Sequence, residues 1–407
     1  MRRVGAALVA ALLAALVCAG SAAASAPRPS PGRAAAAIVI DARSDASLLQ
    51  KRAAARRPIA STTKLMTALL VLERDRLGAV FTAPAYNAAP AESQIHLRKG
   101  ERMKVRDLLT ALLLESANDA AVDLAVGTGD SERHFVALMN RRARALGLTE
   151  THYTNPIGLD EPGNYSSAHD LARLAARLMR NRVFAAVVDR PRAVLRSGAY
   201  TRVVHNRNLL IGRYGFVDGV KTGHTASAGY VLVGAAHGHG GRVISVVLGE
   251  PSEAARDADT LALLRWGIDQ FHKITAVRAG QVLAYARVAH HSGLKIPLVT
   301  RRRALFTLRR GQRLRLRARA PAELSGPLPA GRRVGSVDVV YLGRTVRTLG
   351  LVTARAVPGA GLITRISDYL GPPLTAVALI IVVLGGVLTG LKLRSVLSRG
   401  QRAVSPR

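Results

Sequence analysis

A serine and a lysine three positions apart are the first residues of this chain that could do chemistry together. Ser61 and Lys64 lie at the start of an apolar-periodic segment that predicts a helix over 62–72. Side chains three positions apart share one face of a helix, so the two can reach each other. A serine hydroxyl becomes a nucleophile when a base takes its proton, and a lysine with a lowered pKa can be that base. The pair alone is weak evidence, because Ser61 also fits a plain helix cap.

A second pair of polar side chains follows another predicted helix. Ser116 and Asn118 stand where the helical pattern over 105–114 breaks. A serine hydroxyl can relay a proton, and an asparagine amide can both donate to and accept from a substrate peptide bond. This pair is also weak by itself, since Asn118 and Asp119 could simply begin a new helix.

A third cluster is formed by Lys221, Thr222, Gly223 and His224. At the edge of a strand, Lys221 and Thr222 can bind a substrate carboxylate, while Gly223 lets the substrate backbone come close. A second ammonium group near the site would also help to lower the pKa of Lys64. The chain has only eight lysines, and two of them fall in these motifs. Arginine cannot act as a general base, so a lysine at position 64 matters chemically.

The three motifs in this order resemble the signature of active-site serine penicillin-recognising enzymes. Their flanking residues are similar to those of the D-alanyl-D-alanine carboxypeptidases, the low-molecular-mass penicillin-binding proteins, over about residues 36–271. The segments that carry the resemblance are 58–67, 116–121, 155–159, 205–210 and 218–225. The middle motif, Ser-Ala-Asn, departs from the Ser-Asp-Asn that is common among these enzymes.

The resemblance implies an enzyme that removes the terminal D-Ala from peptidoglycan stem pentapeptides and is covalently inhibited by β-lactams. It implies an acyl-enzyme on Ser61 with Lys64 as base, and an oxyanion hole made by the backbone N–H groups of Ser61 and His224. The other implied roles are Ser116 and Asn118 in the proton path and the substrate amide contact, and Lys221, Thr222 and Arg256 on the terminal carboxylate.

Three alternatives remain open at this point. A D,D-endopeptidase or a β-lactamase would use the same site, and a catalytically weak wall-binding scaffold would retain the same motifs. No cofactor and no metal are expected. His237 and His239 lie in a glycine-rich turn and are more typical of turn residues than of metal ligands.

The elements that must position these motifs predict a layered α/β fold. A strand over 36–40, helices over 105–114 and 167–179, and a hairpin that joins 230–236 to 243–248 are followed by a helix over 252–271. Ser167 and Asp170 fit a capping box at the start of the 167–179 helix. The resemblance makes this a penicillin-binding-protein or β-lactamase-like sheet packed between helices, with a catalytic domain over 36–271.

Residues 273–358 predict a smaller, basic and β-rich domain. This segment has 18 basic residues and only two acidic ones, Glu323 and Asp338. Arginines alternate with other residues over 313–319, so one face of a strand would present a row of guanidinium groups. The row is either a solvated face or a surface that binds anionic lipids or wall polymers.

The first residues read as a secretory signal peptide over 1–24, followed by a spacer over 25–35. A basic start, an apolar run and Ala22-Ala23-Ala24 as a cleavage site support this interpretation, and an uncleaved anchor is the alternative. Cys18 lies inside the segment, so the mature chain would have no cysteine and no disulfide. Export argues against a nucleic-acid partner, although the net charge is +33.

A second apolar run, over 374–391, predicts a transmembrane helix near the C-terminus. Its 18 uncharged residues would extend about 27 Å, close to the hydrocarbon thickness of a bilayer. The tail over 392–407 is basic and has no acidic residue, which predicts a cytoplasmic tail and an extracytoplasmic catalytic domain. The expected location is therefore the cell membrane, with a single span. A buried core helix is the alternative interpretation of the run.

Overall fold

The computed structural model describes residues 27–401, so the predicted signal segment with Cys18 and the last residues of the tail lie outside the described part. The described chain forms two compact units. The larger unit runs to Lys273 and includes Thr307–Arg310; the β-rich unit comprises Ile274–Phe306 and the chain from Gly311 onward.

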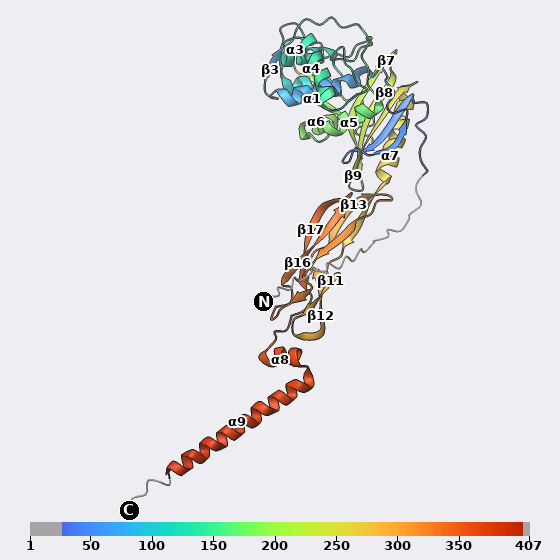
Figure 1. Ribbon diagram of the computed structural model, residues 1–407. Helices are drawn as coiled ribbons and strands as arrows, with labels where there is room; N and C mark the ends of the chain where they lie inside the picture. Colours follow the sequence, from blue (N-terminus) through green and yellow to red (C-terminus); the bar gives the residue numbers. More distant parts are fainter. Residues whose placement is uncertain (1–26, 402–407) are drawn as a thin grey trace, which may run out of the picture. The chain divides into compact units, whose positions relative to one another are not determined.

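A five-stranded antiparallel sheet forms the centre of the larger unit (Figure 1). Its strand order is β2-β1-β9-β8-β7, so the strand that carries the third motif lies at one edge. Ile38 on β1 is opposite Val246 on β9, and Lys221 on β7 is opposite Val233 on β8. The strands are β1 (Ala36–Asp41), β2 (Ser47–Lys51), β7 (Val217–Thr225), β8 (Gly229–Gly238) and β9 (Gly241–Glu250).

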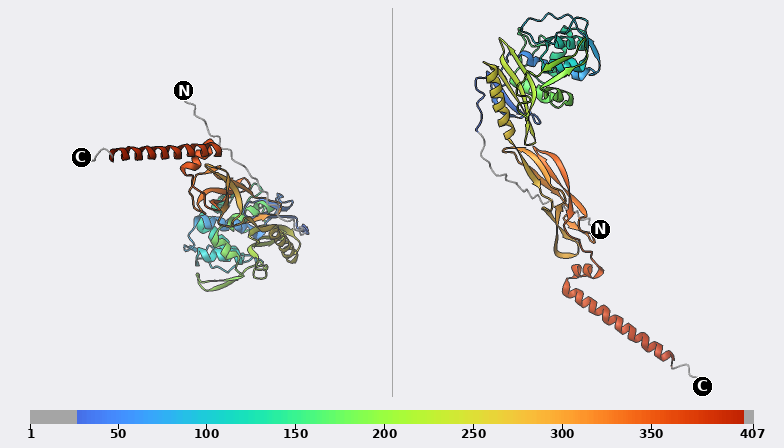
Figure 2. Two further views of the ribbon diagram at one scale, coloured as in Figure 1. Left: turned by 90° about the horizontal axis from the view of Figure 1, so that it is seen from below. Right: turned by 180° about the vertical axis from the view of Figure 1, so that it is seen from behind.

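Helices cover both faces of this sheet, which is why every residue of β1 is buried. Ile38 and Ile40 belong to a large apolar cluster that includes α5 (Ala168–Leu178). The alternate residue Val39 packs into a second cluster with α7 (Glu253–Asp269). Successive side chains of a strand point to opposite faces, so one short apolar strand supplies both layers. Figure 2 shows α7 on one side of the sheet and the other helices on the opposite side. The predicted layered α/β class is confirmed.

The helices beside the sheet, with the turns that join them, carry the first two motifs. Ser167 Oγ accepts a hydrogen bond from the backbone N–H of Asp170, so the predicted cap of α5 is confirmed. Two small two-stranded sheets, β3–β4 and β5–β6, were not predicted from the sequence. The remaining elements are η1 (Ala60–Thr63), α1 (Lys64–Arg74), β3 (Val80–Thr82), β4 (Arg102–Lys104), α2 (Val105–Leu114), α3 (Asn118–Gly129), α4 (Glu132–Ala145), α6 (Arg182–Val188), β5 (Arg192–Leu195) and β6 (Arg202–His205).

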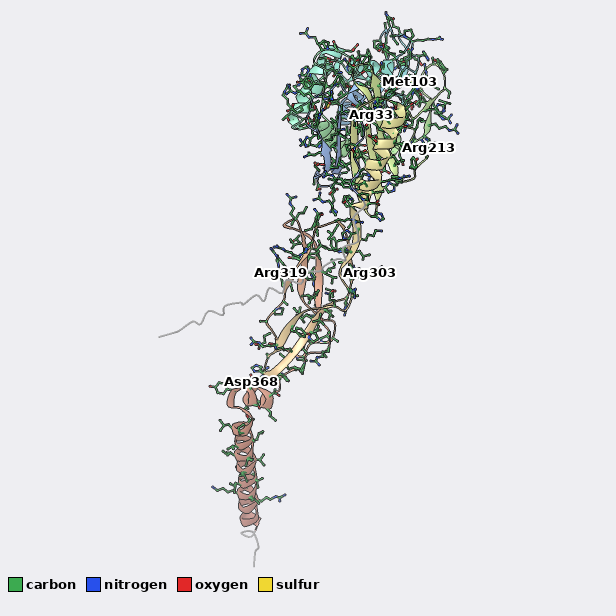
Figure 3. The ribbon with its side chains drawn as sticks, turned by 90° about the vertical axis from the view of Figure 1, so that its right-hand side faces the viewer. Arg33, Met103, Arg213, Arg303, Arg319 and Asp368 are labelled. Atoms are coloured by element: carbon green, nitrogen blue, oxygen red, sulfur yellow. The ribbon has the colours of Figure 1, made fainter. Side chains whose placement is uncertain are left out.

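The β-rich unit contains a six-stranded sheet with the order β14-β16-β17-β12-β11-β15. On β14, at one edge, Arg315, Arg317 and Arg319 are exposed while Leu316 between them is buried, as the alternating pattern predicted. Figure 3 shows Arg319 among the side chains of this unit. Strands β10 (Phe271–Val277) and β13 (Ala304–Arg309) pair separately. The strands of the large sheet are β11 (Val282–Val288), β12 (His291–Thr300), β14 (Arg315–Arg319), β15 (Glu323–Leu324), β16 (Arg333–Tyr341) and β17 (Arg344–Thr353).

Two helices follow the last strand. Helix α8 (Leu362–Leu370) was not predicted, and its apolar side chains Leu362, Ile363 and Tyr369 are exposed. Helix α9 (Pro372–Gln401) contains the apolar run, and its segment Pro373–Arg394 is long and apolar enough to cross a membrane, with a mean hydropathy of 2.5. Only 6% of that segment is buried, whereas a core helix of a soluble domain would be mostly buried.

Candidate active site

The ammonium nitrogen of Lys64 lies 3.0 Å from the hydroxyl oxygen of Ser61. Ser61 is in the short 3-10 turn η1, and Lys64 is the first residue of α1, so the predicted spacing brings the two side chains together. Lys64 is completely buried, while Ser61 is half-buried and can be reached from outside.

Lys64 has two further partners, and both are oxygen acceptors. Its Nζ lies 2.6 Å from Asn118 Oδ1 and 2.6 Å from the backbone carbonyl oxygen of Ile157. A neutral lysine amine has two N–H donors and one lone pair. If the donors serve these two acceptors, the lone pair is left for the Ser61 proton. Burial, and then the charge of Lys221, lowers the pKa of Lys64 well below its usual value, which favours this neutral form.

The second motif lies in the turn between α2 and α3. Ser116 adopts a left-handed backbone conformation with φ of 65°, which non-glycine residues seldom adopt and which occurs preferentially at functional sites. The turn points the Ser116 hydroxyl at Lys221, whose Nζ is 2.8 Å from Ser116 Oγ. Asn118 begins α3 and contacts Lys64. The structure therefore brings the side chains of all three motifs into one site.

Lys221 lies on the edge strand β7 and is almost completely buried. Burial, together with the charges of Arg207 and Arg256, lowers the pKa of Lys221 to about 7, against a smaller opposing effect of Glu115. Near neutral pH this lysine is therefore divided between its charged and neutral forms. Its contact with Ser116 gives a path along which a proton could pass between the two side chains.

Gly223 lies against the turn that carries Ser61. A Cβ atom added at Gly223 would stand 2.9 Å from the backbone nitrogen of Ser61, closer than side-chain atoms normally approach. The next residue, His224, is exposed and its ring stacks on Tyr230 at 4.0 Å between centroids. Thr222, which comes directly before Gly223, is buried. The edge of β7 thus runs past the Ser61 backbone.

Residues 155–159 hold in place the turn η1 that carries Ser61. This segment is part of the resemblance to the family, but the resemblance assigned no role to it. Asn155 Oδ1 accepts hydrogen bonds from the backbone N–H of Ile157 and of Gly158. The turn that results directs the Ile157 carbonyl at Lys64. Gly158 has φ of 90°, and an added Cβ would stand 2.0 Å from the carbonyl oxygen of Ala60. A backbone carbonyl can belong to any residue type, so residue identity does not predict the contact with Lys64. The sequence feature that marks this position is the segment Asn-Pro-Ile-Gly, which is part of the resemblance.

Substitution Gly158→Ala is expected to slow acylation of Ser61 by at least about 10-fold, because the added methyl group must displace the turn at Ala60. The measurement is the rate of labelling by a fluorescent penicillin. Gly163→Ala is the matched control: Gly163 has φ of 88° in the same loop, but its nearest contact is the Thr154 side chain at 3.3 Å. Both variants should lose about 1 kcal/mol of stability from backbone strain. Equal labelling rates would show that Gly158 does not position the nucleophile.

A comparison with known families identifies the chain. The sequence profile of the D-alanyl-D-alanine carboxypeptidases, a peptidase family, matches residues 22–252, which is more than half of the chain and includes every motif residue. The chain belongs to this family. It is a serine-type D-alanyl-D-alanine carboxypeptidase, as the resemblance implied.

The relatives of this carboxypeptidase agree with that assignment. The D-alanyl-D-alanine carboxypeptidase DacD of Escherichia coli is 33% identical over 281 residues, which is 68% of this chain and 72% of the relative. The crystal structure of penicillin binding protein 5 from Haemophilus influenzae is 28% identical with a TM-score of 0.58, and the match covers 82% of this chain and 100% of that one. The DD-transpeptidase of Streptomyces K15 is 33% identical with a TM-score of 0.57, and the match covers 60% of this chain and 100% of that one.

Arg256, which the resemblance placed on the substrate carboxylate, is held inside the carboxypeptidase by two acidic residues. Its guanidinium pairs with Glu253 at 2.7 Å and with Asp257 at 2.8 Å, and its side chain is 3% exposed. Its charge reaches Lys221, whose pKa it lowers. The contact of Arg256 with the substrate carboxylate, which the resemblance implies, stays a prediction.

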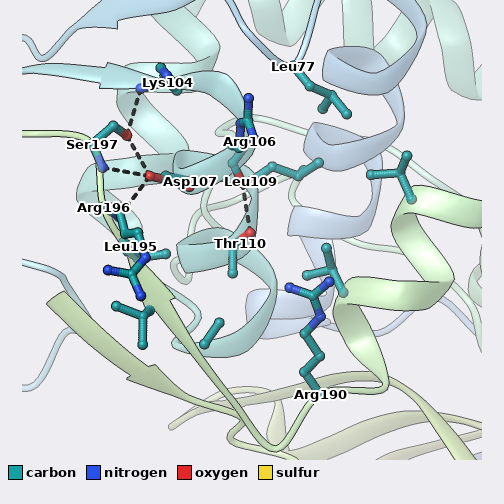
Figure 4. A pocket seen from close by; sticks show the side chains of 14 residues that line it. Leu77, Lys104, Arg106, Asp107, Leu109, Thr110, Arg190, Leu195, Arg196 and Ser197 are labelled. Atoms are coloured by element: carbon teal, nitrogen blue, oxygen red, sulfur yellow. Dashed lines mark hydrogen bonds between the residues drawn. The ribbon is translucent and has the colours of Figure 1, made fainter. Parts of the chain in front are cut away.

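A hollow of about 980 Å³ lies away from the motif residues (Figure 4). Its apolar wall includes Leu109 and Leu195, and four basic side chains stand around it. Asp107 accepts hydrogen bonds from the backbone N–H groups of Arg196 and Ser197 and from the Ser197 hydroxyl. None of the eight predicted site residues lines this hollow. The basic residues are Lys104, Arg106, Arg190 and Arg196.

Proposed function

We propose that the carboxypeptidase removes the terminal D-Ala of peptidoglycan stem pentapeptides through an acyl-enzyme on Ser61, with Lys64 as the general base. The observation that supports this proposal is the environment of Lys64. Its nitrogen is fully buried, lies 3.0 Å from Ser61 Oγ, and has two other acceptors for its two neutral N–H groups. A surface lysine would be charged and could not take a proton at working pH.

In the acylation step, Lys64 takes the Ser61 proton as Oγ attacks the carbonyl carbon of the penultimate D-Ala. The backbone N–H groups of Ser61 and His224 stabilise the oxyanion that forms. The C–N bond then breaks, and the departing amine needs one proton. Ser116, which is hydrogen-bonded to Lys221, can deliver it by passing on the proton that Lys64 took from Ser61, so Lys64 is neutral again before deacylation.

In the deacylation step, Lys64 again acts as base and takes a proton from the water that attacks the ester carbonyl. The bond between the acyl carbon and Ser61 Oγ then breaks, and Lys64 returns the proton to Oγ. Asn118 donates to the substrate amide with an N–H of its side chain, because its Oδ1 is taken by Lys64. In the complex that precedes acylation, Thr222 and Lys221 bind the terminal carboxylate of the pentapeptide, and Gly223 leaves room for the substrate backbone beside Ser61. β-Lactams are expected to acylate the same hydroxyl and remain bound.

The proposed activity can be tested by incubating the purified full-length enzyme with a pentapeptide that ends in D-Ala-D-Ala. One D-Ala should be released per peptide, and benzylpenicillin should block the release. Cleavage of a cross-linked peptide dimer in preference to the pentapeptide would indicate an endopeptidase. Rapid hydrolysis of the penicillin would indicate a β-lactamase, and absence of both turnover and labelling would indicate a scaffold.

The proposed topology has a signal peptide over 1–24, a spacer over 25–35, a catalytic domain over 36–271 and a basic β-rich domain over 273–358. Residues 374–391 would span the membrane once, with the tail over 392–407 in the cytoplasm. The apolar segment of α9 supports this arrangement, because its exposed apolar side chains would otherwise face water. The catalytic domain would then act on the wall from the outer surface of the membrane.

A stop codon at Pro372 is expected to release an active, soluble enzyme, because every motif residue precedes Lys273. The released form should keep its turnover of a free pentapeptide, measured as D-Ala release, and should no longer sediment with membranes. Retention on membranes at high salt would place the anchor elsewhere, for example in an uncleaved signal segment.

The basic β-rich domain is expected to bind anionic surfaces. The released form should bind vesicles that contain phosphatidylglycerol, and salt should weaken the binding because exposed charges are screened within about 8 Å at physiological ionic strength. Replacing Arg315 and Arg317 with serine should reduce the binding more than the same change at Arg133 and Arg144 of α4, which are also exposed. Equal losses would mean that the arginine row is a solvated face.

A further inference from the structure

Glu92 lies next to the proposed active site, on the chain between β3 and β4, and has no role in the mechanism described above. Its carboxylate is the centre of a local hydrogen-bond network. Oε2 accepts from Asn118 Nδ2 at 2.6 Å and from the hydroxyl of Tyr86, and Oε1 accepts from the backbone N–H of Ala89 at 3.0 Å. The short Asn118 contact is typical of a hydrogen bond to an ionised carboxylate.

This contact decides which way the Asn118 amide faces. An ionised carboxylate can only accept hydrogen bonds, so the NH₂ group of Asn118 must face Glu92 and its carbonyl oxygen must face Lys64. In the flipped orientation the NH₂ group would meet the N–H donors of Lys64. The lone pair of Lys64 would then have to turn to Asn118, away from Ser61. The orientation that Glu92 enforces is the one that leaves this lone pair for Ser61.

The backbone around Asn118 is anchored to the same stretch of chain as Glu92. The N–H of Asn118 donates to the carbonyl oxygen of Ser93 at 2.7 Å. The Asp119 carboxylate accepts from the backbone N–H of Ile95 at 3.1 Å and of Leu97 at 2.9 Å. These backbone contacts fix the segment that carries Glu92 against the start of α3, where Asn118 lies.

Glu92 also places a negative charge near Lys64. Burial raises the pKa of Glu92, but hydrogen bonds from Tyr86, Ala89 and Asn118 and the charge of Lys64 outweigh it, so the net pKa is lowered and the group is ionised. Three charged groups act on the pKa of Lys64. Lys221 of β7 lowers this pKa, whereas Glu92 of the loop and Asp119 of α3 raise it. Glu92 is the larger of the two acidic influences.

We propose that Glu92, supported by Tyr86, is a positioning residue that holds the Asn118 carbonyl oxygen on Lys64 and sets the pH range in which Ser61 is acylated. This inference rests on the proposed function, in which Lys64 must be neutral to act. Glu92 touches Asn118 rather than the reacting atoms, so it acts on catalysis through Asn118 and Lys64.

The test is the pH profile of the second-order rate constant for acylation by a penicillin, measured on the full-length enzyme. Glu92→Gln keeps the shape of the side chain and removes its charge. Its maximal rate should fall about 10-fold, because the Asn118 amide is no longer fixed. The acidic limb of its profile should move to lower pH, because the charge that raised the pKa of Lys64 is gone. Glu92→Asp, which restores the charge on a shorter side chain, should return the limb toward the wild-type position.

Two further variants separate position from charge. Tyr86→Phe removes one hydrogen bond from Glu92 but leaves its charge, so the maximal rate should fall several-fold while the acidic limb stays in place. Glu150→Gln is the charge-matched control. Glu150 pairs with Arg56 on the surface, and the variant should keep the wild-type profile.

An acidic limb that does not move in Glu92→Gln would overturn the proposal, whatever happens to the rate. A residue with a merely structural role can change the rate, but it would leave the pH profile in place. An unchanged rate would overturn it as well. Failure of the proposed function itself is seen separately, in the wild-type enzyme, as a penicillin adduct on a residue other than Ser61.

Discussion

Substitution Ser61→Ala is expected to abolish both D-Ala release and covalent penicillin labelling. The loss should be at least about 10⁴-fold, as for removal of the nucleophile in other serine hydrolases. The physical reason is that Ser61 Oγ is the hydroxyl within 3.0 Å of the buried Lys64 nitrogen, and alanine leaves nothing to acylate. Release can be followed by chromatography of free D-Ala, and labelling by gel fluorescence.

The control for this variant is Ser292→Ala, which removes an exposed serine hydroxyl from the β-rich unit and should leave both activities unchanged. Thermal unfolding of Ser61→Ala should match the wild type, because Ser61 is only half-buried. Labelling that persists in the alanine variant would assign the nucleophile to another residue.

Substitution Lys64→Arg is expected to lower the acylation rate by about 10²- to 10⁴-fold although it keeps the positive charge, which is the range of general-base contributions. The guanidinium group stays protonated at working pH and cannot take the Ser61 proton. The wild-type rate should rise with pH as Lys64 loses its proton, and level off well below pH 10.5, because burial and Lys221 lower the lysine pKa. The arginine variant should lack that rise.

Lys99→Arg is the matched control, since Lys99 is an exposed lysine of the same unit and should tolerate the change. The measurement is the second-order rate constant for penicillin labelling across the pH range. Near wild-type rates in Lys64→Arg would make Lys64 an electrostatic residue and require a different base.

Residue spacing in the sequence predicted one part of the site well, for a physical reason. Ser61 and Lys64 are three positions apart at the start of a helix, so local geometry alone brings them together. The approach of Lys221 to Ser116, 105 positions earlier in the chain, depends on how strand β7 packs against the helices, and spacing says nothing about that. Only the resemblance to a family connected those motifs before the structure did.

The parts of the site that the sequence did not reveal are backbone groups and a loop side chain. The Ile157 carbonyl that binds Lys64 could belong to any residue type, so its identity carries no signal. Glu92 lies 26 positions before Asn118, outside the motifs and outside the helix that begins at Asn118. No motif or helical spacing in the sequence therefore singles it out.

The order of the strands in the sheets could not be predicted from the sequence either. The alternating arginines predicted the exposed face of β14 correctly, because a strand repeats every two residues. The same pattern does not say that β14 lies at the edge of the sheet, or that β11 pairs in parallel with the short strand β15. Those neighbours are set by packing between distant segments. Helix α8 was missed because nine residues beside a longer apolar run gave no separate signal.

The central claim is that the acyl group is carried by Ser61. The most direct test is to trap the wild-type enzyme with a penicillin, digest it, and locate the added mass by tandem mass spectrometry. The adduct is predicted on Ser61, at one per chain, and the same site should carry the peptidyl group when a D-Ala-D-Ala peptide is quenched in acid during turnover. An adduct on Ser116 or any other residue, with Ser61 unmodified, would contradict the account.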